Sequence, residues 1–181
     1  MGSSYQRTDE KDSDDVRRDK NYSNLCGGRG MKHENEMELV FESRSVNEGF
    51  ARVAVAAFLT QLNPTVEEVS DVKTAVSEAV TNAIIHGYEK EVEKIWIRCR
   101  LNEQTLYIEV EDHGKGIENI EEAMEPLFTT KPELERSGMG FSFMEAFMDG
   151  IEVESNPGSG TIVKMQKIIG KGRKLWSTQS L

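Results

Sequence analysis

The chain has 181 residues, of which 37% are apolar and 30% charged, and its formal net charge at pH 7 is −10. An acidic excess of this size argues against nucleic acid or an anionic membrane as the main partner, and no apolar run has the length of a membrane span. The two cysteines, Cys26 and Cys99, lack the spacing of a metal site or a redox pair. We therefore expect a reduced, cytoplasmic protein.

Residues 1–30 carry almost no large aliphatic side chains, and their acidic and basic residues balance. We expect this leader to be disordered. The letters "GGRGM" are what a purine-rich ribosome-binding site followed by a start codon gives when it is translated in frame. We therefore hypothesise that Met31 is the native start, that residues 31–169 form the working domain, and that residues 170–181 are a frayed basic tail.

The first expected elements are a strand and a helix. The alternation in "MELVFES", residues 37–43, is typical of a strand. Residues 45–62 have helical periodicity, and Ser45 and Glu48 have the spacing of a capping box at the start. Asn63 and Pro64 end this helix. Its expected core-facing residues are Val46, Phe50, Val53, Ala54 and Ala57.

A second capping box, Thr65 and Glu68, predicts a helix that ends at Gly87. Residues 94–101 and 105–112 are β-type runs that predict a hairpin. A glycine-containing loop follows, then a stretch at 125–140 whose length is typical of a lid, a short helix at 141–148 and a closing hairpin at 150–168. This order predicts an α+β fold of two layers, with the helices packed on one face of a mixed, mostly antiparallel sheet.

The stretch "SEAVTNAIIHGYE", residues 77–89, places Glu78 and Asn82 one turn apart, away from the aliphatic stripe. A solvated polar face is one interpretation. Asparagine is unfavourable in the middle of a helix, however, because its side chain competes for backbone hydrogen bonds. An amide oxygen and a carboxylate at this spacing suit a Mg²⁺ ion and a general base.

Two glycine motifs follow. Asp112 ends a strand and is followed by Gly114 and Gly116, which would let the backbone approach a flat ligand closely; an ordinary strand-end turn is the alternative. Gly138 and Gly140 precede a helix, where free N–H groups and the helix dipole favour phosphate. The "GSGT" of residues 158–161 is compatible with any hairpin turn.

Together, in this order, the motifs resemble the Bergerat-type ATP-binding domain shared by gyrase, Hsp90, histidine kinases and MutL. The stretches "SEAVTNAIIHGYE" and "EPLFTTKPELERSGMGF" further resemble the anti-sigma F factors of spore-forming bacteria, which are serine kinases. The resemblance extends from Met31 to about Ile168.

The resemblance implies roles for individual residues. Asn82 would hold Mg²⁺ on the phosphates of ATP or ADP, and Glu78 would accept the proton of the substrate serine. Asp112 would hydrogen-bond the adenine amine, with Thr161 nearby and Gly114 and Gly116 beside it. The lid would include Thr129, Thr130 and Lys131, and the phosphates would be cradled by Gly138, Met139 and Gly140.

The resemblance also implies partners: an F-type sigma factor that is held inactive, an anti-anti-sigma protein that is the kinase substrate, and a second copy in a homodimer. Arg52 would contact a partner, although an i,i+4 pair with Glu48 is an alternative role. Two rival functions remain: a nucleotide-gated sequestering module without phosphoryl transfer, and the ATPase half of a histidine kinase. Residues 1–30 lack the heptads that the second rival requires.

Overall fold

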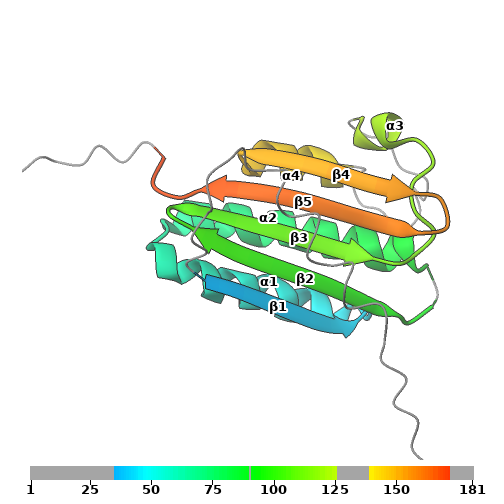
Figure 1. Ribbon diagram of the computed structural model, residues 1–181, viewed down its shortest axis with the longest axis horizontal. Helices are drawn as coiled ribbons and strands as arrows, with labels where there is room; N and C mark the ends of the chain where they lie inside the picture. Colours follow the sequence, from blue (N-terminus) through cyan, green and yellow to red (C-terminus); the bar gives the residue numbers. More distant parts are fainter. Residues whose placement is uncertain (1–34, 90, 126–138, 172–181) are drawn as a thin grey trace, which may run out of the picture. The chain divides into compact units, whose positions relative to one another are not determined.

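A computed structural model describes residues 35–89, 91–125 and 139–171, and these residues form a sheet with helices on one face (Figure 1). The strands are β1 (Asn35–Glu42), β2 (Lys94–Asn102), β3 (Thr105–Asp112), β4 (Gly150–Asn156) and β5 (Gly160–Ile168). The helices are α1 (Val46–Leu59), α2 (Val66–Asn82), α3 (Ile120–Met124) and α4 (Gly140–Phe147), with short helical turns η2 (Thr60–Leu62) and η3 (Ala83–Gly87).

The strands lie in the order β1-β2-β3-β5-β4, and each of these described pairings is antiparallel. The expected α+β class is confirmed. The last strand does not lie at the edge, because β5 is inserted between β3 and β4. Its register places Thr161 opposite Asp112.

The core lies between the sheet and the helices, and the alternation of the strands explains it. Every second residue of β2 and β3 is buried, while the residues between them face the open side of the sheet. The buried strand residues pack against the aliphatic face of α2, which includes the buried Val76 and Val80. Cys99 belongs to this core, and burial raises the pKa of its thiol to about 12, so the thiol stays protonated and unreactive.

Helix α1 turns a different face to the core from the one expected. The residues buried there are Ala51, Val55, Ala56 and Leu59, whereas Val46, Phe50 and Val53 are exposed by 81%, 55% and 56%. The expectation was wrong because α1 is apolar nearly all round, so periodicity alone did not distinguish its two apolar faces. The exposed residues Val46, Phe50 and Val53 are referred to below as the α1 strip.

The two expected capping boxes have different outcomes. At the start of α2 the box is confirmed: the Thr65 N–H donates to Glu68 Oε2 at 2.6 Å, and the Glu68 N–H donates to Thr65 Oγ1 at 3.1 Å. At the start of α1 the expectation was wrong, because Ser45 has helical backbone angles and makes no side-chain cap. Glu48 instead reaches α2, where it accepts a hydrogen bond from Ser77.

This difference predicts unequal costs for two similar substitutions. Thr65→Ala should lower the free energy of unfolding by about 1 kcal/mol, a shift of roughly 2–4 °C in Tm, because it leaves the Glu68 N–H without its acceptor. Ser45→Ala should change stability by less than about 0.5 kcal/mol, since no cap is lost. Thermal unfolding of the nucleotide-free protein measures both, and equal losses would contradict the assignment of the caps.

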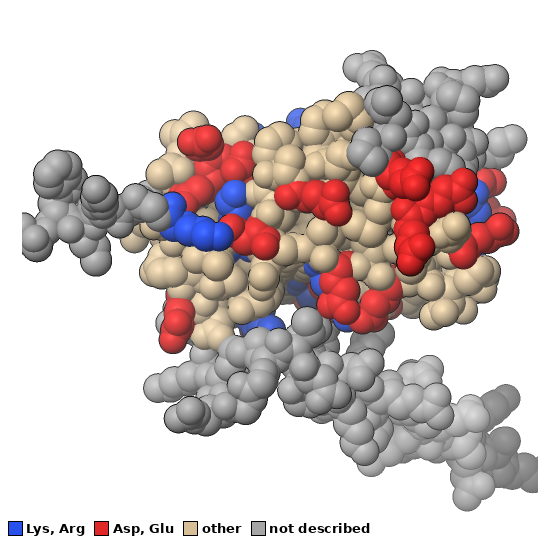
Figure 2. All heavy atoms as spheres, turned by 90° about the horizontal axis from the view of Figure 1, so that it is seen from above, with Lys and Arg blue, Asp and Glu red and all other residues tan. Residues whose placement is uncertain are grey.

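On the side that carries α4 and β4, Asp and Glu cover more of the surface than Lys and Arg (Figure 2). This distribution agrees with the net charge of −10. Among the residues that the structure describes, no helix is both long enough and apolar enough to cross a bilayer.

Candidate functional site

Glu78 and Asn82 lie together on the side of α2 that faces the start of α4. A Cβ atom at Gly140 would lie 3.2 Å from Glu78 Oε2 and 3.3 Å from Asn82 Oδ1. Both side chains are half-buried. The sequence motifs at 78–82 and 139–140 are therefore adjacent in space, and the first residue of α4 lacks a side chain where it meets a carboxylate and an amide.

Asp112 is a buried carboxylate at the end of β3, with 6% of its surface exposed. Its Oδ1 accepts a hydrogen bond from the Gly114 N–H at 2.8 Å, and the Thr161 backbone donates a second hydrogen bond to the carboxylate. Burial raises the pKa of Asp112 above its ordinary value, and the two backbone hydrogen bonds partly offset this rise. The carboxylate is thus a fixed acceptor in poorly hydrated surroundings.

Glycines allow three backbone segments to pack against Asp112. A Cβ at Gly160, whose φ is +88°, would lie 2.0 Å from the Asp112 carbonyl oxygen, and a Cβ at Gly87 would lie 2.8 Å from Asp112 Oδ1. A Cβ at Gly114 would lie 2.3 Å from the Gly87 carbonyl oxygen. Side chains are excluded at all three positions because a Cβ there would collide with backbone atoms or with the Asp112 carboxylate. The packing of the protein itself therefore restricts these positions more tightly than the flat ligand that the sequence suggested.

Backbone hydrogen bonds tie the same segments together. The Lys115 N–H donates to the Gly87 carbonyl at 3.0 Å, and the Gly158 N–H donates to the Lys115 carbonyl at 2.6 Å. The glycine loop after β3 is therefore held on one side by the end of the α2–η3 helix and on the other by the β4–β5 turn. The "GSGT" motif, compatible from sequence with any turn, belongs to this assembly.

Ser155 is a site residue that sequence reasoning missed. Its hydroxyl lies 2.9 Å from Thr161 Oγ1 and accepts from the Ile117 N–H at 2.8 Å. It therefore fixes Thr161 and the exit of the glycine loop together. A polar residue at an inward-facing position of the last hairpin was the available signal.

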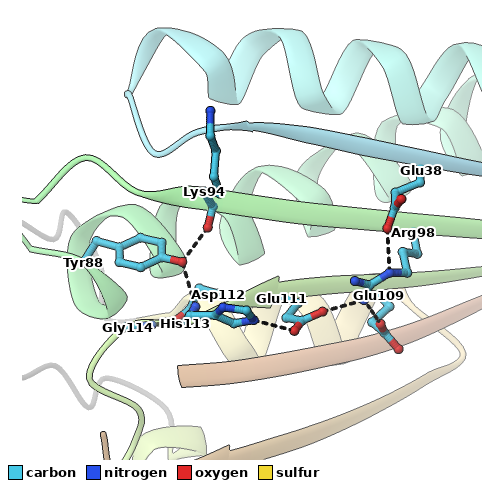
Figure 3. A network of polar contacts seen from close by, with 9 residues as sticks. All are labelled: Glu38, Tyr88, Lys94, Arg98, Glu109, Glu111, Asp112, His113 and Gly114. Atoms are coloured by element: carbon cyan, nitrogen blue, oxygen red, sulfur yellow. Dashed lines mark hydrogen bonds and ion pairs between the residues drawn. The ribbon is translucent and has the colours of Figure 1, made fainter. Parts of the chain in front are cut away.

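Tyr88 is a second missed residue, and it fixes the start of the same loop (Figure 3). Its hydroxyl donates to the Lys94 carbonyl and accepts from the His113 N–H at 2.7 Å. Burial raises the pKa of this phenol, so it remains a neutral donor. An aromatic residue directly after the helix-ending Gly87 was the signal.

A charged network continues from His113 across the open face of the sheet (Figure 3). His113 stacks on Trp96 and places Nε2 2.7 Å from Glu111, and Arg98 bridges Glu111 and Glu38. Burial alone would raise the pKa of Glu111, but hydrogen bonds from His113 and Arg98 outweigh it and lower the pKa. Glu111 and Asp112 point to opposite faces of β3, so they serve different environments.

The predicted site residues thus form two groups in the described part of the chain. One contains Glu78, Asn82, Met139 and Gly140, and the other contains Asp112, Gly114, Gly116 and Thr161. Arg52 lies on α1, where it pairs with Glu48 at 3.3 Å. Four predicted residues lie outside the described residues: Thr129, Thr130, Lys131 and Gly138.

Comparison with known proteins bears on the family and the fold of this chain. Residues 41–167 match the family described as the histidine kinase-like ATPase domain. The RsbU and RsbW domains of a Mycobacterium tuberculosis protein share the fold with a TM-score of 0.55 at 17% identity, over 75% of this chain and 32% of theirs. The fold and the family match therefore define an ATP-binding domain.

Two curated relatives narrow the assignment. The anti-sigma F factor of Caldanaerobacter subterraneus subsp. tengcongensis is 59% identical over 143 residues, covering 79% of this chain and all of the relative. The anti-sigma F factor of Bacillus subtilis strain 168 is 54% identical over 142 residues, covering 78% and 97%. The chain belongs to the anti-sigma F factor family, whose members are serine kinases, and this membership confirms the predicted family and enzyme class.

Proposed function

We propose that this chain binds an F-type sigma factor and holds it inactive, and that it uses ATP and Mg²⁺ to phosphorylate a serine of the opposing anti-anti-sigma protein. The observation that carries the proposal is the pairing of Glu78 and Asn82 against Gly140 at the start of α4. A carboxylate and an amide are brought there to a helix N-terminus, where phosphate oxygens are favoured.

The residues around Asp112 fit the adenine end of ATP. A purine amine is a donor, and Asp112 is a buried acceptor whose position is fixed by Gly114 and Thr161. Gly116, with φ of +72°, lets the loop turn where a Cβ would lie 2.2 Å from the Asn156 carbonyl oxygen. ATP supplies the phosphoryl group; these residues bind its base and orient it.

The residues of the other group fit the phosphate end. The amide oxygen of Asn82 is a hard ligand of the kind Mg²⁺ accepts alongside water and phosphate oxygens. The backbone of Gly138, Met139 and Gly140 is assigned to the phosphates, with Thr129, Thr130 and Lys131 in the lid. Glu78 would accept the proton of the attacking serine hydroxyl, the role of a positioned carboxylate in phosphoryl transfer to a hydroxyl.

The surface of α1 suits protein partners. The α1 strip is apolar and exposed. We assign this surface to the homodimer, and Arg52, on the same helix, to the contact with the sigma factor or its antagonist. Nucleotide state would select the partner if the affinity for each differs between the ATP and ADP forms.

The experiment that tests the proposal is a transfer assay. The purified chain is incubated with labelled ATP, Mg²⁺ and the candidate anti-anti-sigma protein, and sigma factor capture is measured with ATP or ADP. Label on a partner serine, lost when Mg²⁺ is chelated, is the expected result. Sigma capture without any label would leave a nucleotide-gated sequestering module and overturn the kinase assignment.

Arg52→Glu is expected to weaken sigma binding about a hundredfold, the loss of about 2–3 kcal/mol typical of a central interface arginine. ATP affinity should stay within about twofold, because Arg52 pairs with Glu48 on α1 and not with the nucleotide groups. Calorimetry measures both. The matched control is Lys164→Glu on the open face of the sheet, which should leave both affinities unchanged, and parallel loss of both in Arg52→Glu would indicate misfolding.

A further inference from the structure

Glu48 connects two helices through one carboxylate oxygen. Its Oε1 accepts a hydrogen bond from Ser77 Oγ on α2, and the same oxygen lies 3.3 Å from Arg52 Nη1 on α1. Neither Glu48 nor Ser77 has a place in the function proposed so far. Their contact was absent from the sequence expectations, where Glu48 was assigned to a cap.

The two charged side chains differ in how far solvent reaches them. The Glu48 side chain is 21% exposed, whereas the Arg52 side chain is 43% exposed. The Glu48 side chain is therefore better shielded than that of Arg52, and a charge pair on the surface would by itself hold Arg52 weakly. A hydrogen bond from a second helix removes rotamers that Glu48 would otherwise populate, and so restricts Arg52 as well.

We propose that Glu48 is a positioning residue: held by Ser77, it orients the guanidinium of Arg52 toward the protein partner. The inference rests on the proposed function, because it takes Arg52 as the partner contact. It adds that Ser77 on α2, the residue directly before Glu78, controls the orientation of this partner contact. Partner binding and the residue assigned to proton transfer are thereby joined through adjacent residues of one helix.

The proposal predicts an effect for Ser77, a residue that is assigned neither to ATP nor to a partner. Ser77→Ala should weaken sigma factor binding fivefold to tenfold while ATP affinity is unchanged, whereas Ser77→Thr, which keeps the hydroxyl, should bind as wild type. Thr74→Ala is the matched control, because that hydroxyl on the same helix donates to Ser70 within α2. It should bind the sigma factor as wild type.

A double-mutant cycle separates positioning from general destabilisation. If Ser77 acts through Arg52, Ser77→Ala should have no further effect on sigma binding in an Arg52→Ala background. An equal loss in both backgrounds, or no loss in either, would overturn the proposal.

A second measurement needs no partner and keeps the inference distinct from the proposed function. The NMR order parameter of the Arg52 Nε–H group in the free protein should fall in Ser77→Ala and stay at the wild-type value in Ser77→Thr and Thr74→Ala. An unchanged order parameter in Ser77→Ala would overturn the positioning role. Failure of the wild-type chain to bind sigma factor, with the order parameter behaving as expected, would count against the proposed function alone.

Discussion

Replacing Glu78 by glutamine is expected to slow serine phosphorylation severely while the affinity for ATP stays within about twofold. Glutamine keeps the size of the side chain, so its contact with Gly140 at the start of α4 is preserved, but a neutral amide does not accept the serine proton. General-base catalysis contributes about 10²–10⁴-fold to the rate, and we expect a loss of this size. Single-turnover label transfer measures the rate, and equilibrium titration measures ATP binding.

The matched control is Glu67→Gln, which removes the same charge from the exposed first turn of the same helix. Its transfer rate should equal that of the wild type. A Glu78→Gln chain that retains transfer within tenfold would show that another group takes the proton. A chain that loses ATP as well would place Glu78 in nucleotide binding.

The second large effect is expected at Asp112, where asparagine should weaken ADP binding about a hundredfold. A hydrogen bond to a charged group contributes about 1.5–3 kcal/mol. This contribution would be lost because the asparagine oxygen that replaces the carboxylate is a weaker, neutral acceptor. The new NH₂ group would also face a backbone donor, since both Gly114 and Thr161 donate to the carboxylate. Glu152→Gln, an exposed charge removal on β4, is the control that should bind normally.

A change in the ligand tests the same contact without relying on the fold of the variant. Inosine diphosphate carries an oxygen where ADP carries the amine, so the wild type should prefer ADP strongly. Asp112→Asn should discriminate far less between the two. Equal binding of both nucleotides by the wild type would remove Asp112 from adenine recognition.

The raised pKa of Asp112 gives this contact a pH dependence with a definite sign. The pKa of Asp112 in the folded, nucleotide-free protein lies above the ordinary value of 3.8. In the pH interval between these two values, the folded protein binds a proton that the unfolded chain does not. The stabilisation from this group is therefore present at low pH and is lost as pH rises through the folded-state pKa. The protonated carboxyl is a poor acceptor for the amine. Acidification through the interval should therefore weaken ADP binding in the wild type more than in Asp112→Asn.

Much of the fold was predictable because two periodicities dominate the sequence. The β-type runs at 94–101 and 105–112 predicted β2 and β3 as a hairpin, and the Thr65–Glu68 box marked the start of α2. Helix α1 was the failure, because a helix that is apolar on two faces needs its neighbour to decide which face is buried. The five-residue helix α3, capped by Asn119, was also not expected, since it is too short to have a readable period.

The candidate site was predictable in its chemistry and less so in its construction. Asn82 was distinguishable because asparagine is unfavourable in the middle of a helix, Glu78 by its position one turn before Asn82, and Asp112 by its position at a strand end before two glycines. Tyr88 and Ser155 were missed because each acts through backbone groups of other segments, and their local signals do not show which segments those are. The glycines were found, but their neighbours, and hence the reason for them, depend on tertiary packing.

Because β5 pairs with both β3 and β4, the sheet is not complete until β5 has been synthesised. A nascent chain that ends before Gly160 contains β4 without the strand it pairs with, and β3 with one edge open. Thr161, which donates to Asp112, and Gly160, which packs on it, arrive with that final strand. The surroundings of Asp112, which we assign to adenine, are therefore incomplete until β5 has been synthesised, and we expect chains that end before Gly160 not to bind ATP.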